Sequence, residues 1–119
     1  MTDQSAAPRA LPFHVRQGDV LVVEVDAVPD DAHPVARDAG RVVLAYGEVT
    51  GHAHAIRSAT ATLVADRVGR RYLRATDDVT LTHEEHASID LPAGDYEVII
   101  QREYVPAPVG VPAWRRVAD

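Results

Sequence analysis

The sequence contains no cysteine and no lysine, and it has a single tryptophan, a single phenylalanine and a single methionine. Without cysteine the chain cannot form a disulfide framework, a thiolate metal site or a thiol nucleophile. Without lysine it cannot form a Schiff base with a substrate. Because aromatic residues make up only 5% of the chain, the core has to be built mainly from aliphatic side chains.

The sequence also lacks long hydrophobic runs and an excess of positive charge. Its longest aliphatic runs, residues 20–23 and 98–100, are far shorter than the roughly 20 residues that span a bilayer. The first residues carry neither the cationic start nor the apolar stretch of a signal peptide. A net charge of −6 disfavours nonspecific binding to nucleic acid or to an anionic membrane. We therefore expect a soluble cytoplasmic protein that binds neither.

A length of 119 residues with 46% hydrophobic residues indicates one globular domain. Residues 1–12 are rich in alanine and proline and predict a flexible tail. Residues 13–105 form the expected domain. Residues 106–119 contain three prolines and predict an extended C-terminal arm, with Trp114 as its candidate anchor.

The pattern between these ends favours strands. Runs of four to eight β-branched and apolar residues are separated by Gly, Pro and Asp turns, and no long window keeps a helical period. The expected strands cover residues 20–26, 41–46, 52–57, 59–66, 71–76, 79–83, 87–91 and 96–105. This predicts an all-β fold with little helix, either a single small antiparallel barrel or a sandwich. The acidic segment 30–38 is the place where we expect a helix, if there is one.

The first histidine cluster is His52 and His54, directly after Gly51. On a strand these two residues share a face, with Cα atoms about 6–7 Å apart. Two imidazoles at that spacing can converge on one metal ion at about 2.0–2.1 Å. The alternative is a pair of half-exposed histidines on an edge strand.

The second cluster is His83-Glu84-Glu85-His86. An unbroken strand over residues 79–91 would be about 43 Å long, which exceeds the ~35 Å diameter of a domain of this size. The chain must therefore bend, and these four polar residues are where we expect the bend. A bend or a single helical turn would bring His83 and His86 together. The alternative is a solvated acidic turn.

Taken together, the two clusters predict one divalent transition-metal site formed by His52, His54, His83 and His86. With histidine and carboxylate as the available ligands, zinc is our first expectation, and iron, manganese, nickel or copper also suit the site. The other two histidines stand alone. We expect His14 to be a strand residue with a backbone partner and His33 to be exposed.

Two carboxylates lie between the second pair of histidines. Glu85 is the first candidate for a catalytic acid or base acting on metal-bound water, and Glu84 is the second. Strand parity places Glu85 on the face of His83 if the extended conformation continues past that residue. Either residue could instead orient a histidine ligand, or simply face solvent.

The order of these motifs resembles the cupin family. A glycine precedes His-x-His on a short strand, a further histidine lies downstream, and a Leu-Pro-x-Gly turn at residues 91–94 precedes the closing strand. The resemblance covers residues 47–105 and implies a small barrel that holds one divalent metal, with the paired histidines and His83 or His86 as ligands. The sequence departs from the family pattern at Ser58, where cupins carry a glutamate ligand, and its Pro-x-Gly turn follows the last histidine.

Two functions follow from a histidine metal site. The first is a small mononuclear metalloenzyme, with a coordination position open to water or to a small-molecule substrate. The second is a non-catalytic structural or interaction module, held together by a closed four-histidine site and bound to a protein partner in a larger assembly or to further copies of itself. Ligand number distinguishes the two, because structural sites are closed and catalytic sites keep an open position.

Overall fold

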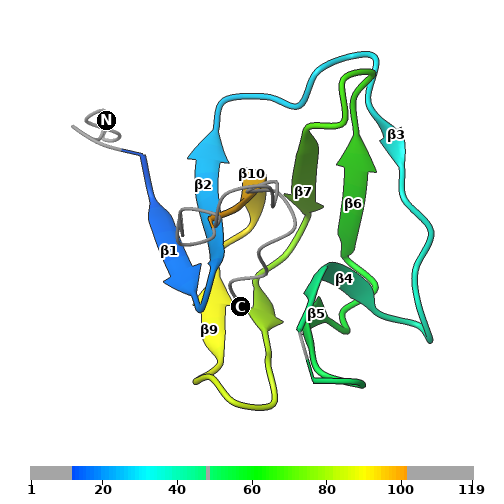
Figure 1. Ribbon diagram of the computed structural model, residues 1–119. Helices are drawn as coiled ribbons and strands as arrows, with labels where there is room; N and C mark the ends of the chain where they lie inside the picture. Colours follow the sequence, from blue (N-terminus) through cyan, green and yellow to red (C-terminus); the bar gives the residue numbers. More distant parts are fainter. Residues whose placement is uncertain (1–11, 48, 102–119) are drawn as a thin grey trace, which may run out of the picture.

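A computed structural model describes residues 12–47 and 49–101. These residues form ten antiparallel strands and no helix, which confirms the all-β prediction (Figure 1). It follows that no helix in this part of the chain could cross a membrane. Three predictions lie outside the described residues. These are the N-terminal tail except for Pro12, the end of the last expected strand, and the C-terminal arm with Trp114.

The larger layer is a six-stranded sheet in the order β1-β2-β10-β7-β6-β3. Its strands are β1 (His14–Gln17), β2 (Val20–Val25), β10 (Gly94–Ile100), β7 (Arg71–Ala75), β6 (Ala61–Ala65) and β3 (His33–Pro34). β1 and β3 are the two edges, so the sheet does not close into a barrel. Of the two architectures that the sequence allowed, the sandwich fits.

The smaller layer consists of two hairpins. One pairs β4 (Val42–Tyr46) with β5 (Ala53–Ile56), and the other pairs β8 (Val79–Leu81) with β9 (Ile89–Leu91). Two backbone hydrogen bonds between Ala55 and Thr82, of 2.9 and 3.0 Å, connect β5 to the end of β8. The hairpins are thereby aligned edge to edge.

The hydrophobic core lies between these layers. Burial alternates along strands such as β4 and β8, where one set of side chains points inward, whereas all four residues of β5 are buried. From the larger sheet the core receives Val20, Val22, Leu73, Tyr96 and Val98, and from the hairpins Leu44, Ile56, Leu81 and Leu91.

The helix expected within residues 30–38 is wrong. This segment contains the two-residue strand β3, which pairs with β6, and Val35 donates its backbone N–H to Leu63 O at 2.8 Å. Pro34 explains the outcome, because proline lacks the N–H that an interior helical position requires, whereas an edge strand tolerates it.

Candidate metal centre

Three chain segments meet at one end of the sandwich. They are the β1–β2 turn (residues 17–19), the start of β5 (residues 52–54) and the loop between β8 and β9 (residues 82–88). The turn is a two-residue hairpin connection, with Gln17 paired to Val20 and a positive φ of 58° at Gly18. Glycine is favoured at the first position of such turns because it adopts positive φ without strain.

His54 and Gln17 are the two buried polar residues of the described chain, each with 2% of its surface exposed. The Gln17 amide nitrogen donates to Leu81 O at 3.1 Å and to Ala87 O at 2.9 Å. These two bonds fix the orientation of the amide, so its oxygen faces His54 Nδ1 at 2.8 Å. Because an amide oxygen can only accept, His54 must carry a hydrogen on Nδ1.

The other ring nitrogen of His54, Nε2, faces Asp19. The Nε2–Oδ1 distance is 3.6 Å, and the two side chains are 3% and 14% exposed. With the hydrogen of a neutral imidazole already on Nδ1, Nε2 presents a lone pair to a carboxylate oxygen. When the ring is protonated, both of its nitrogens donate, and the contact with Asp19 is then an ion pair.

His83 directly precedes a bend at residues 84–86, and His86 is the last residue of that bend, which lies where the sequence predicts one. Their ring centroids are 4.7 Å apart. The His83 ring also lies 4.3 Å from that of His54 and 5.8 Å from that of His52, and His54 and His86 are 5.8 Å apart. Two imidazoles on one tetrahedral ion would have centroids about 5 Å apart, given a metal–nitrogen bond of about 2.0–2.1 Å.

The two glutamates of the loop contact different partners. Glu85 Oε2 lies 3.2 Å from His52 Nδ1, where a carboxylate can hold the ring and direct Nε2 away from itself. Glu84 Oε1 accepts the backbone N–H of Ala53 at 2.9 Å, and this hydrogen bond lowers the pKa of the Glu84 carboxyl. The ligand atoms of His52, His83 and Glu84 all lie within 4.8 Å of one another.

Two glycines leave space for the rings. A Cβ at Gly18 would lie 2.7 Å from His86 Nε2 and 3.3 Å from His54 Cε1. A Cβ at Gly47 would lie 3.2 Å from His52 Cβ and 3.5 Å from His83 Nε2. A side chain at Gly18 could not coexist with the present position of His86, so this glycine allows the histidine ring to lie over the turn.

The structure therefore brings together all six residues that the sequence singled out, namely His52, His54, His83, Glu84, Glu85 and His86. The two isolated histidines lie elsewhere, as expected. His14 begins β1 with Nδ1 3.2 Å from Pro12 O, and His33 is exposed in β3.

Gln17 and Asp19 also belong to this site, although neither was predicted from the sequence. A signal for Gln17 was present, because it continues the alternating row of Phe13 and Val15 on the inward side of β1. A glutamine in an inward row predicts a buried amide that needs partners. Asp19 gave no comparable signal, because aspartate is ordinary in a tight turn.

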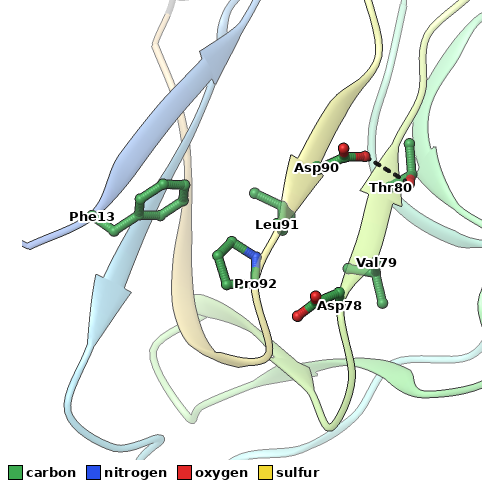
Figure 2. Close-up of a pocket in the computed structure, with 7 residues that line it drawn as sticks. All are labelled: Phe13, Asp78, Val79, Thr80, Asp90, Leu91 and Pro92. Carbon is green, nitrogen blue, oxygen red and sulfur yellow. Dashed lines mark hydrogen bonds between the residues drawn. The ribbon is translucent and has the colours of Figure 1, made fainter.

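A separate hollow of about 400 Å³ lies at the opposite end of the β8–β9 hairpin (Figure 2). It is lined by Phe13, Asp78, Val79, Thr80, Asp90, Leu91 and Pro92. Its two carboxylates already accept hydrogen bonds, Asp90 from Thr80 Oγ1 and Asp78 from the backbone of Ala93. The loop that carries the histidines leaves the other end of this hairpin, so the hollow is not part of the histidine site.

The described residues thus define a small antiparallel β-sandwich with a histidine- and carboxylate-rich end. The chain belongs to a family described as a domain of unknown function (DUF8820), whose sequence model matches residues 16–101. The match includes every residue of the site, from Gln17 to His86. No curated protein and no solved structure matches the chain.

Proposed function

We propose that this domain binds a divalent transition-metal ion through His52, His54, His83 and His86, with zinc as the first expectation. The observation that supports it most strongly is the packing of four imidazoles from two separate segments, with centroid distances of 4.3–5.8 Å. Such proximity would be unfavourable if several of the rings were protonated, because like charges would be juxtaposed. A shared cation removes that cost.

The surroundings of two histidines support the same proposal. His54 gives its Nδ1 hydrogen to Gln17, and His52 Nδ1 faces the Glu85 carboxylate. Metal-binding histidines usually donate their second ring N–H to a carboxylate, carbonyl or amide, which fixes the tautomer and raises the basicity of the ligating nitrogen. Both residues therefore present Nε2 in the form that binds a metal.

The direct test is calorimetric titration of metal-free protein, purified without a histidine tag, with zinc. We expect saturable binding that weakens by at least about tenfold in His83→Ala, because its ring contacts the other three and its loss removes a ligand. His33→Ala is the matched control, since His33 is exposed on β3, and it should bind zinc as the unmodified protein does. Absence of saturable binding, or equal loss in both variants, would refute the proposal.

Catalysis at the metal is the second candidate function, and the exposure of the β8–β9 loop favours it. Glu84, Glu85 and His86 are exposed, so a substrate could approach the site from this side. The contact of Glu85 with His52 suits a residue that orients a ligand, whereas Glu84 lies among the ligand atoms. Of the two acid–base candidates, Glu84 is therefore the better placed to meet metal-bound water.

An exchangeable coordination position distinguishes an enzyme from a structural module. On the catalytic proposal, azide added to the cobalt-substituted protein should change the visible spectrum of the metal, because a bound water is displaced. A spectrum that azide leaves unchanged would indicate a closed structural site. The azide titration of cobalt-substituted Glu84→Gln tells whether the Glu84 carboxylate occupies the exchangeable coordination position.

A further inference from the structure

The hollow at the end of the β8–β9 hairpin has an apolar base and is separate from the histidine site. Figure 2 shows the Phe13 ring on one side of it and Leu91 and Pro92 on the other. Of its apolar lining, Val79 and Leu91 are buried, Phe13 is half-buried and Pro92 is exposed. A volume of about 400 Å³ lies within the range of small-ligand pockets, so the hollow can hold a large side chain.

The aromatic lining of the hollow suits a further aromatic ring. The Phe13 ring meets that of Tyr96 edge to face, with centroids 6.3 Å apart and an interplanar angle of 67°. Tyr96 is only 1% exposed, so Phe13 continues an aromatic pair from the core to the hollow. A third ring placed there would bury the exposed part of Phe13 in the kind of contact that aromatic side chains favour.

The rim of the hollow is acidic. Asp90 is paired with Thr80 across the hairpin, and strand alternation places Asp78 on the same outward face. Each carboxylate accepts one hydrogen bond of 3.0 Å through Oδ1, Asp90 from Thr80 Oγ1 and Asp78 from the N–H of Ala93. No ion pair joins either aspartate to another residue of the described chain. The rim therefore offers two negative charges to a cationic partner.

We propose that the C-terminal segment of the chain occupies this hollow, with Trp114 on the apolar base and Arg115 and Arg116 at the acidic rim. The segment follows the described residues, and Trp114 is the single tryptophan of the chain. Tryptophan has a large apolar surface to bury, and guanidinium groups form strong hydrogen-bonded pairs with carboxylates. The sequence Trp-Arg-Arg therefore matches the two parts of the hollow, and this contact does not depend on bound metal.

The chain is long enough to make the contact. Gln101, the last described residue, lies at the far end of β10 from the hollow, where its N–H donates to Asp19 O at 2.7 Å. The seven residues of β10 span about 23 Å. Thirteen residues lead from Gln101 to Trp114, and they reach about 40 Å at the rise of roughly 3.1 Å per residue of a polyproline helix. The segment can therefore return along the sandwich to the hollow.

Fluorescence of the full chain tests the contact directly, because Trp114 is its single tryptophan. We expect emission at shorter wavelength than that of free tryptophan, and weak quenching by acrylamide. Asp90→Arg reverses a charge at the rim and should shift the emission to longer wavelength and strengthen the quenching. Asp30→Arg is the matched control, since Asp30 is exposed in the β2–β3 loop, and it should change neither. Equal emission from the two variants would overturn the proposal.

Proton NMR of the unmodified full chain locates the ring without any substitution. We expect nuclear Overhauser contacts between the Trp114 indole and the methyl groups of Val79 and Leu91, both with and without zinc. Emission like that of free tryptophan, or indole contacts only with residues outside the hollow, would overturn the proposal. A short-wavelength emission that is lost on dilution would also overturn it, because the hollow would then hold the segment of a second copy.

Discussion

Replacing Gln17 with leucine is expected to lower the free energy of unfolding by about 3 kcal/mol or more. The substitution removes three hydrogen bonds of 2.8–3.1 Å, of which those to Leu81 O and His54 Nδ1 are buried and that to Ala87 O is partly buried. A buried polar group that loses its partner costs about 1–3 kcal/mol. The loss is large against a total stability of about 5–15 kcal/mol for a typical domain, and urea denaturation measures it directly.

The same substitution should weaken zinc binding by about ten- to a hundredfold, because it removes the hydrogen bond that keeps a hydrogen on His54 Nδ1 and helps to orient the ring. Gln17→Glu separates the two effects. A carboxylate still accepts from His54 Nδ1 but cannot donate to the two carbonyl groups, so we expect reduced stability with zinc affinity largely retained.

Gln101→Leu is the matched control for Gln17→Leu. Gln101 is an exposed glutamine at the end of β10, and its side chain accepts a hydrogen bond from Arg16. A surface substitution of this kind should change stability by less than about 0.5 kcal/mol. If Gln17→Leu costs no more than Gln101→Leu, the buried amide does not hold the three segments together.

The sequence predicts most of the fold because each layer of the sandwich buries one face. Seven of the eight expected strands correspond to β2 and β4 to β9, and the eighth overlaps β10, with boundaries that differ by a few residues. Alternation between core and solvent is a local property, so it can be recognised without knowing which strands are neighbours. The order β1-β2-β10-β7-β6-β3 depends on pairings between distant segments, which a local pattern does not contain.

The histidines of the site could be recognised from their spacing, but the environment of each ring could not. His54 depends on Gln17 and Asp19, which lie more than thirty residues earlier and reach it only through the packing of the β1–β2 turn against the two hairpins. Strand parity placed Glu85 on the face of His83 only if the extended conformation continued past that residue. The chain bends at residues 84–86 instead, so Glu85 contacts His52, and a Glu84 oxygen lies within 4.8 Å of the ring nitrogens of His52 and His83.

The cupin resemblance stays a prediction, and Ser58 is a position at which the sequence departs from the family pattern. At the position where cupins carry a glutamate ligand, Ser58 Oγ lies 2.7 Å from Thr60 Oγ1 in the β5–β6 turn. The carboxylates near the histidines come instead from the β1–β2 turn and the β8–β9 loop. The donor types are similar, but different segments supply them.

Saturating zinc is expected to raise the melting temperature by about 10–20 °C. A ligand that binds only the folded state at a hundred times its dissociation constant stabilises it by about 2.7 kcal/mol. A domain of this size shifts by about 4–8 °C for each kcal/mol. The increase should be large because the bound ion connects the β8–β9 loop to β5, two segments that are held mainly by side-chain contacts and the Ala55–Thr82 bridge. Magnesium at the same concentration should have little effect, since it prefers oxygen ligands.

The zinc-induced increase in melting temperature tests the assignment of His54 as a ligand, whereas the melting temperature of a variant by itself does not. His54→Ala leaves the Gln17 amide oxygen without its histidine partner, so it lowers stability even without metal. Its decisive effect should be that zinc no longer raises the melting temperature to the same extent. His14→Ala is the control, because His14 is exposed on β1. The side-chain hydrogen bond described for it joins Nδ1 to the carbonyl oxygen of Pro12, two residues earlier in the chain. This variant should retain the full increase, and an equal increase in both variants would show that zinc stabilises the fold without His54.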